Sequence, residues 1–122
     1  IDDLDLAQSD IRGANLWAAN LENADLNGAN LTGVNLSFAN LRQASFVGTD
    51  LNRANLENAN CDGVNLSKAN LMDAKLNSAY FGNADLLEVT HLTQEQIETA
   101  KGNAATRLPA GLHMPASWKN HP

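Results

Sequence analysis

The chain has 122 residues, of which 14 are acidic and 8 are basic, so its formal net charge at pH 7 is −6. This length allows one domain with one core, and the acidic balance argues against direct binding to nucleic acid, which needs a basic surface. No apolar run approaches the length of a membrane span, so we expect no membrane insertion. Cys61 is the single cysteine, which excludes an internal disulfide.

Over residues 1–90, a buried-type side chain recurs at every fifth position, from Ile1 to Leu86. The residue two positions earlier is Ala, Val or Thr throughout the stretch from Ala14 to Ala84, and the residue between is usually Asn or Asp. A strict period of this kind is typical of a repeat protein. The expected structural core includes the recurring large side chains Leu16, Leu26, Leu36, Phe46, Leu56, Leu66, Leu76 and Phe81.

A period of five fits neither of the regular secondary structures. It would spread the leucines around an α-helix, and it would place successive leucines on opposite faces of a strand. Within one repeat, however, Ala and Leu are two residues apart and share one face of a short extended segment. The chain must therefore turn once per repeat, which predicts an all-β solenoid whose stacked coils share one core.

The number of repeats in one coil does not follow from the period, but the charges favour four. Residues 20 apart in sequence would then lie above one another, and this separation places Arg42 between Glu22 and Asp62 and pairs Lys68 with Glu88. It gives more opposite than like pairs, whereas separations of 15 and 25 do not. Opposite charges that face each other across neighbouring strands are stabilising.

The pattern A-(D/N)-L-x-x, as in Ala14-Asn15-Leu16 and Ala69-Asn70-Leu71, resembles the pentapeptide repeat family over most of the chain. The resemblance implies a right-handed quadrilateral β-helix with four repeats per coil. Carried onto residues 1–90, it implies a rod of about four and a half coils.

After residue 90 the repeat pattern stops, and residues 91–122 are expected to cap the solenoid as part of the same domain. Thr93 and Gln96 form a capping-box pattern that predicts a helix over about residues 94–101, with Ile97 facing the last coil. Gly102 is then expected to be the C′ glycine that ends this helix.

The segment after this helix is punctuated by proline and glycine and is expected to be non-helical. Leu108, Leu112 and Trp118 are its predicted anchors on the helix and the last coil. A helix followed by such a tail resembles the C-terminal segment of bacterial, cyanobacterial and plastid members of the family.

No pattern of residues typical of catalysis, metal binding or cofactor binding is present in the sequence. His91, His113 and His121 do not have the spacing of a metal site, and there is no phosphate-binding loop or nucleophile elbow. The many Asn and Asp residues are expected to serve turns and backbone hydrogen bonds. We therefore expect no catalytic residues, no metal and no cofactor, and a protein that is not an enzyme.

Trp17 and Phe38 are predicted to point outward on adjoining coils, which makes them the candidate interaction surface. The leading hypothesis is a non-enzymatic protein-binding or scaffolding module, whose protein partner and oligomeric state the sequence does not identify. The alternative is an acidic DNA mimic that modulates a DNA-binding protein such as gyrase, since some members of the family act in this way. This chain shares their acidity, but it is shorter and its charge is modest.

The compartment stays open at this stage. The chain begins with Ile1 and not with Met, which indicates a processed or trimmed N-terminus. Members of the family occur in the cytoplasm and in exported or thylakoid-lumen locations.

Overall fold

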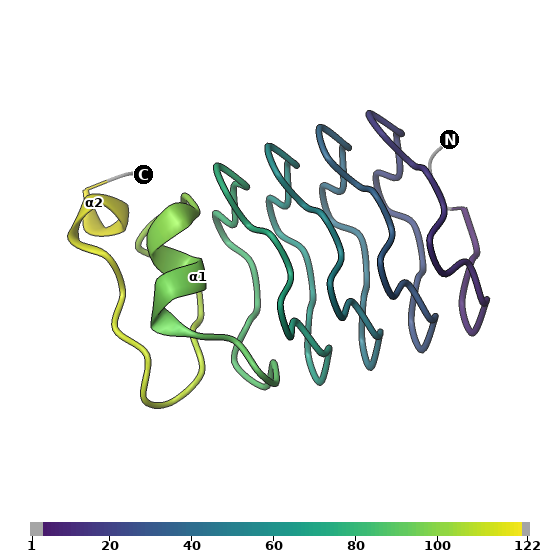
Figure 1. Ribbon diagram of the computed structural model, residues 1–122. Helices are drawn as coiled ribbons and strands as arrows, with labels where there is room; N and C mark the ends of the chain where they lie inside the picture. Colours follow the sequence, from purple (N-terminus) through teal and green to yellow (C-terminus); the bar gives the residue numbers. More distant parts are fainter. Residues whose placement is uncertain (1–3, 121–122) are drawn as a thin grey trace.

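The computed structural model describes residues 4–120, so Ile1 and His121 lie outside the described residues. The chain forms a rod of stacked coils with two short helices at its C-terminal end (Figure 1). Parallel bridges join residues 20 apart, such as Asp5 with Asp25 and Asn30 with Asp50. Because 20 residues hold four five-residue repeats, each coil has four sides. The prediction of four repeats per coil is confirmed.

Each side of a coil pairs with its neighbours through a single bridging residue, the Asn or Asp of the repeat or its substitute. Around Asp25, for example, the backbone N–H of Leu26 donates to Ser45 O at 2.8 Å, and Ser45 N–H donates back to Ala24 O at 2.9 Å. Within residues 4–120 the β-structure therefore consists of isolated parallel bridges, and no segment forms an extended strand.

Each corner is a tight turn that begins at the large inward residue of the repeat, which is usually Leu. In the turn after Leu26, the N–H of Ala29 donates to Leu26 O at 3.1 Å, and Gly28 has a φ of +68°. Left-handed backbone at the third residue is the pattern of a type II turn. The residue before the Leu also supports the turn: Asn55 Oδ1 accepts from Glu57 N–H at 2.9 Å. Equivalent bonds recur along the rod, which confirms that Asn and Asp serve the turns.

The interior of the rod is formed by the recurring large side chains and the small residues beside them. Seven of the predicted core side chains are at most 2% exposed, namely Leu26, Leu36, Phe46, Leu56, Leu66, Leu76 and Phe81. Leu16 differs, because it is only half-buried. It packs against the core, but the described residues place a neighbouring coil on one side of Leu16 only.

The first helix, α1, spans Gln94–Thr99 and begins with the expected capping box. Thr93 Oγ1 accepts from Gln96 N–H at 3.1 Å, and Gln96 Oε1 accepts from Thr93 N–H at 2.8 Å. The helix ends two residues earlier than predicted, because Lys101 returns to the solenoid and forms a parallel bridge with Tyr80.

The backbone ladder therefore continues beyond the last sequence repeat, and a further bridge joins Asp85 to Arg107. The prediction for Gly102 is wrong: Ala100 is the C-cap, and Gly102 does not have a left-handed φ. Gly102 instead leaves room for an aromatic ring, since a Cβ there would lie 2.5 Å from Trp118 Cε3.

The tail contains a second helix, α2, at Ala116–Lys119, so the prediction of a wholly non-helical tail is also wrong. Trp118 on this helix is 1% exposed, and its Nε1–H donates to Ala100 O at 3.3 Å. Leu108 and Leu112 are half-buried and pack against the core.

Candidate interaction surface

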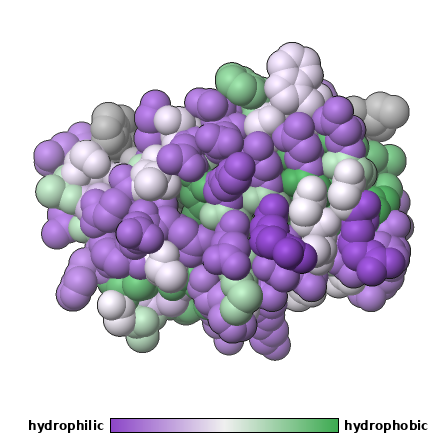
Figure 2. Space-filling model, in the orientation of Figure 1, coloured by the Kyte–Doolittle hydropathy of each residue, from purple (hydrophilic) through white to green (hydrophobic). Residues whose placement is uncertain are grey.

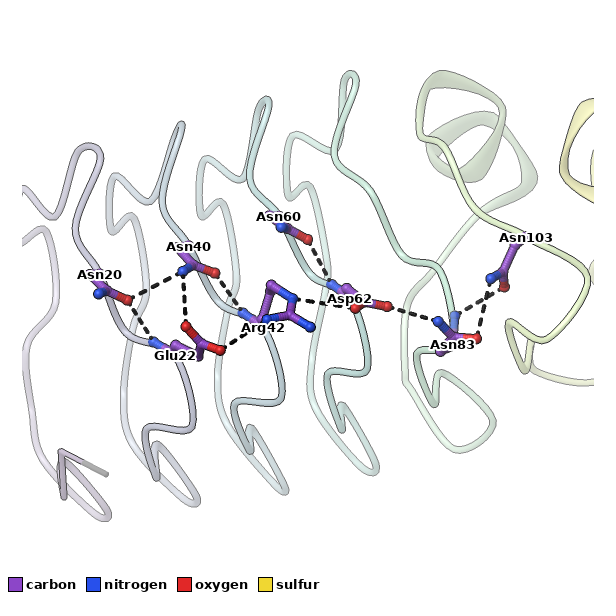
Figure 3. A network of polar contacts seen from close by, with 8 residues as sticks. All are labelled: Asn20, Glu22, Asn40, Arg42, Asn60, Asp62, Asn83 and Asn103. Atoms are coloured by element: carbon purple, nitrogen blue, oxygen red, sulfur yellow. Dashed lines mark hydrogen bonds and ion pairs between the residues drawn. The ribbon is translucent and has the colours of Figure 1, made fainter. Parts of the chain in front are cut away.

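One side of the rod carries a continuous network of polar side chains (Figure 3). Arg42 forms ion pairs with Glu22 at 2.9 Å on one neighbouring coil and with Asp62 at 3.4 Å on the other. The network continues as Asn83 Nδ2 donates to Asp62 Oδ1 at 2.8 Å, and Asn103 Nδ2 donates to Asn83 Oδ1 at 3.2 Å. These side chains bind one another and tie successive coils to the C-terminal segment.

The predicted site residues Trp17 and Phe38 lie together on a different part of the rod. Their rings are 6.2 Å apart between centroids and tilted by 56°, a favourable geometry for an aromatic pair. The side chain of Trp17 is 60% exposed and that of Phe38 is 57% exposed. We call the pair and its two turns the aromatic corner. The two turns belong to consecutive coils. Trp17 occupies the second position of its turn, and Phe38 occupies the third position of its turn.

Phe38 occupies an unfavourable backbone conformation. The third turn position is left-handed at all 16 corners from Gln8 to Asn83, and 5 of these residues are glycines. Phe38, with a φ of +61°, is the only aromatic residue at that position. Left-handed backbone costs a residue other than glycine about 1–3 kcal/mol. The fold tolerates Phe38 but gains no burial of its ring, because the ring remains largely in solvent.

The sides of the coils that flank the aromatic corner carry asparagine amides. Asn35 Nδ2 donates to Asn15 Oδ1 at 3.4 Å on one side of the corner, and Asn40 Nδ2 donates to Asn20 Oδ1 at 3.3 Å on the other. Hydrophilic side chains cover most of the face in Figure 2, with small hydrophobic areas between them. The aromatic pair therefore stays largely exposed to solvent between polar side chains.

The other predicted site residues lie at the C-terminal end. Thr93, Ile97, Leu108 and Trp118 position α1 and the tail, as described above. Gln96 has a second role that sequence reasoning missed: its Nε2 donates to Leu71 O at 2.9 Å and to Ala74 O at 3.0 Å. The capping box identified Gln96 as a helix residue, but nothing in the sequence indicated that its amide would also satisfy carbonyl groups of the turn from Leu71 to Ala74.

Residues 4–120 contain no group of three His, Cys, Asp or Glu side chains placed to hold a metal ion. A hollow of about 450 Å³ beside α1 is lined by Met72, His91 and Glu95, among others. Cys61 is buried in the core, and burial raises the pKa of its thiol to about 12, so it stays protonated at neutral pH.

None of the helices in residues 4–120 has the length and apolar character that crossing a membrane requires. The exposed apolar side chains outside the aromatic corner, Met72 and Leu87, are isolated from one another in sequence and lie at different corners.

The family model for pentapeptide repeats matches this chain in 8 copies, over residues 9–48, 35–71 and 49–87. The chain belongs to the pentapeptide repeat family, and its fold is the right-handed quadrilateral β-helix of that family. The sequence matches none of the curated proteins with which it was compared.

Several solved structures of the family are similar. The pentapeptide repeat protein Rfr23 from the cyanobacterium Cyanothece 51142 is 32% identical over 85% of this chain, with a TM-score of 0.55; the chain spans 63% of its length. Protein alr5209 from Nostoc PCC 7120 is 35% identical, with 87% of this chain and 77% of that protein covered and a TM-score of 0.46. HetL from Nostoc sp. strain PCC 7120, described as involved in heterocyst differentiation regulation, is 25% identical, with 83% and 51% covered and a TM-score of 0.42.

Proposed function

We propose that this chain is a non-enzymatic protein-binding module and that the aromatic corner is its contact surface. The observation that carries the proposal is the contact between two large aromatic side chains that both remain largely in solvent. The rings of Trp17 and Phe38 are 6.2 Å apart, and the two residues are 60% and 57% exposed. Left-handed backbone is common to all 16 corners from Gln8 to Asn83 and does not single out Phe38, but its bulky ring gains little burial from the fold.

The composition of the corner fits recognition of a protein. Tryptophan is among the residues most enriched in binding hot spots, and large aromatic side chains gain most when a partner removes them from water. The rigid rod holds Trp17 and Phe38 in fixed positions, so little conformational entropy remains to be lost on binding.

The C-terminal segment supports this function by protecting the end of the rod. We place the repeat rod in residues 1–90, as about four and a half coils, and its cap in residues 91–122 of the same domain. The contacts of Gln96 with Leu71 O and Ala74 O satisfy backbone groups that an open end would expose. Ile97 and Trp118, both 1% exposed, cover apolar core at the same end.

The proposal is tested by affinity capture from a cell lysate with the wild-type chain and with the double variant Trp17→Ala, Phe38→Gly. A matched control is Met72→Ala, Leu87→Ala, which removes the two other large exposed apolar side chains. We expect a protein that the wild type and the control retain and the aromatic-corner variant loses. Equal recovery by all three would reject the aromatic corner as the contact surface.

The acidic DNA-mimic alternative has less support from the distribution of charge. Arg42 lies between Glu22 and Asp62 and pairs with both, so this side of the rod does not present a row of unpaired carboxylates. A direct test is DNA supercoiling by gyrase in the presence of excess protein. Inhibition that survives loss of the aromatic corner would favour the mimic over the binding module.

A further inference from the structure

The aromatic corner has an acidic neighbour, Glu57, on the next coil. We infer that Trp17, Phe38 and Glu57 together form a site for an arginine side chain of a protein partner. This inference rests on the proposed function and adds to it the chemistry of the group that binds.

The coil register places Glu57 beside the pair. Trp17, Ser37 and Glu57 are 20 residues apart and occupy the second turn position at the same corner of three successive coils. Ser37 is only 7% exposed although it lies at an outward turn, which shows that the column is closely packed around it. Phe38 is connected directly to the third coil, since its N–H donates to Glu57 O at 2.9 Å.

The dimensions of this column suit a guanidinium group. Neighbouring coils are about 4.8 Å apart, so the backbones at Trp17 and Glu57 are separated by about 10 Å. Trp17 and Phe38 belong to the first two of these coils and Glu57 to the third. We expect a flat cation that packs on the indole ring to reach the carboxylate of Glu57 at the same time.

The charge at Glu57 is not neutralised within the described part of the chain. The ion pairs there are those of Asp10 with Arg12, of Glu22 and Asp62 with Arg42, and of Asp85 with Arg107. The nearest basic residue by register is Lys75, which bridges to Asn55 through its backbone. Its exposed side chain forms no ion pair with Glu57 in the structure, but it competes for the same carboxylate.

Arginine is the partner residue that these groups favour. Cations bind best over the face of tryptophan, and arginine is found there more often than lysine. Its planar guanidinium also pairs with a carboxylate through two hydrogen bonds, which the compact ammonium of lysine does not do. The net charge of −6 on the whole chain adds a longer-range attraction for a basic segment.

The test uses two blocked tripeptides, leucyl-arginyl-leucine and its analogue with citrulline, which has nearly the same shape but no charge. Binding is followed by NMR through the indole N–H signal of Trp17 at constant ionic strength. The indole N–H of Trp118 is an internal control, because it is buried and already bonded to Ala100 O. We expect a saturable shift of the Trp17 signal only, with the citrulline peptide binding about threefold to tenfold more weakly.

Three variants make the result specific. Glu57→Gln should weaken binding of the arginine peptide about threefold to tenfold, whereas Glu88→Gln, which removes the same charge from another corner, should leave it unchanged. Lys75→Gln should strengthen binding, because it removes the competing cation. Equal effects of Glu57→Gln and Glu88→Gln, or equal binding of the two peptides, would overturn the arginine assignment.

The test also separates this inference from the proposed function. If both peptides bind the wild type equally and lose their affinity with Trp17→Ala, Phe38→Gly, the aromatic corner is a binding surface but not an arginine site. If neither peptide shifts the Trp17 signal, the arginine assignment falls, while capture of a protein partner that depends on the corner would leave the proposed function standing.

Discussion

The two tryptophans of this chain lie in regions with opposite roles. Trp118, in the C-terminal segment, is 1% exposed, packs on Gly102 and donates a hydrogen bond to Ala100 O. Trp17, near the other end of the rod, is 60% exposed, and its ring contacts Phe38, another exposed residue. The same residue type holds the fold together at one end and is available to a partner at the other. The comparison teaches that the fold buries one tryptophan and leaves the other exposed, and the exposed one is where we propose that a partner binds.

The largest expected difference is between the two truncations to alanine. Trp118→Ala removes a fully buried ring and should lower the free energy of unfolding by about 3–5 kcal/mol. Trp17→Ala should change it by no more than about 0.5 kcal/mol, because exposed substitutions seldom do more. Chemical denaturation of both variants measures the difference. Similar losses for the two would remove the distinction between the regions.

A second comparison concerns the small inward position of the repeats. Ala59 is 1% exposed, and a leucine there would overpack the interior of the coil. Ala59→Leu should therefore cost about 1–3 kcal/mol in the free energy of unfolding. Ala104→Leu is the control, because this alanine is exposed in the C-terminal segment. Thermal melts that do not differ between the two variants would contradict the narrow core.

The polar network offers a third and smaller effect. Arg42 joins Glu22 and Asp62 across three coils, and its side chain is 42% exposed. Arg42→Met should cost about 0.5–1 kcal/mol, and the cost should fall at high salt because exposed ion pairs are screened. Arg12→Met is the matched control: Arg12 pairs with Asp10 inside a single turn, so no coil contact is lost. A loss that is independent of salt would indicate that Arg42 acts through packing.

The repeating part of the fold was largely predictable, because one five-residue pattern dictates it many times over. The period predicted the inward positions. The pairing of Arg42 with residues 20 positions away predicted from the sequence that one coil contains 20 residues. The lower burial of Leu16 could not be predicted, because burial also depends on what lies on both sides of a coil, and the period does not contain this information.

The C-terminal segment was predicted less well, because it has no repetition to average over local signals. Gly102 was interpreted as a helix terminator from its position alone, whereas its role depends on Trp118, 16 residues further along the chain. The return of Lys101 and Arg107 to the ladder also had no signal in sequence, since insertions break the register of 20 there. At the aromatic corner, the repeat pattern placed Trp17 and Phe38 outward, but the left-handed conformation of Phe38 could be identified only from the backbone of the structure.

The most direct test of the central claim is the free energy of unfolding of Phe38→Gly. Glycine relieves the left-handed strain of about 1–3 kcal/mol, and this gain exceeds the loss of an exposed aromatic contact and the extra entropy of glycine in the unfolded chain. Our account predicts that the variant is more stable than the wild type by about 0.5–1 kcal/mol. A loss of more than about 1 kcal/mol would show that the Phe38 ring is part of the structure, and the aromatic corner would no longer be a surface kept for binding.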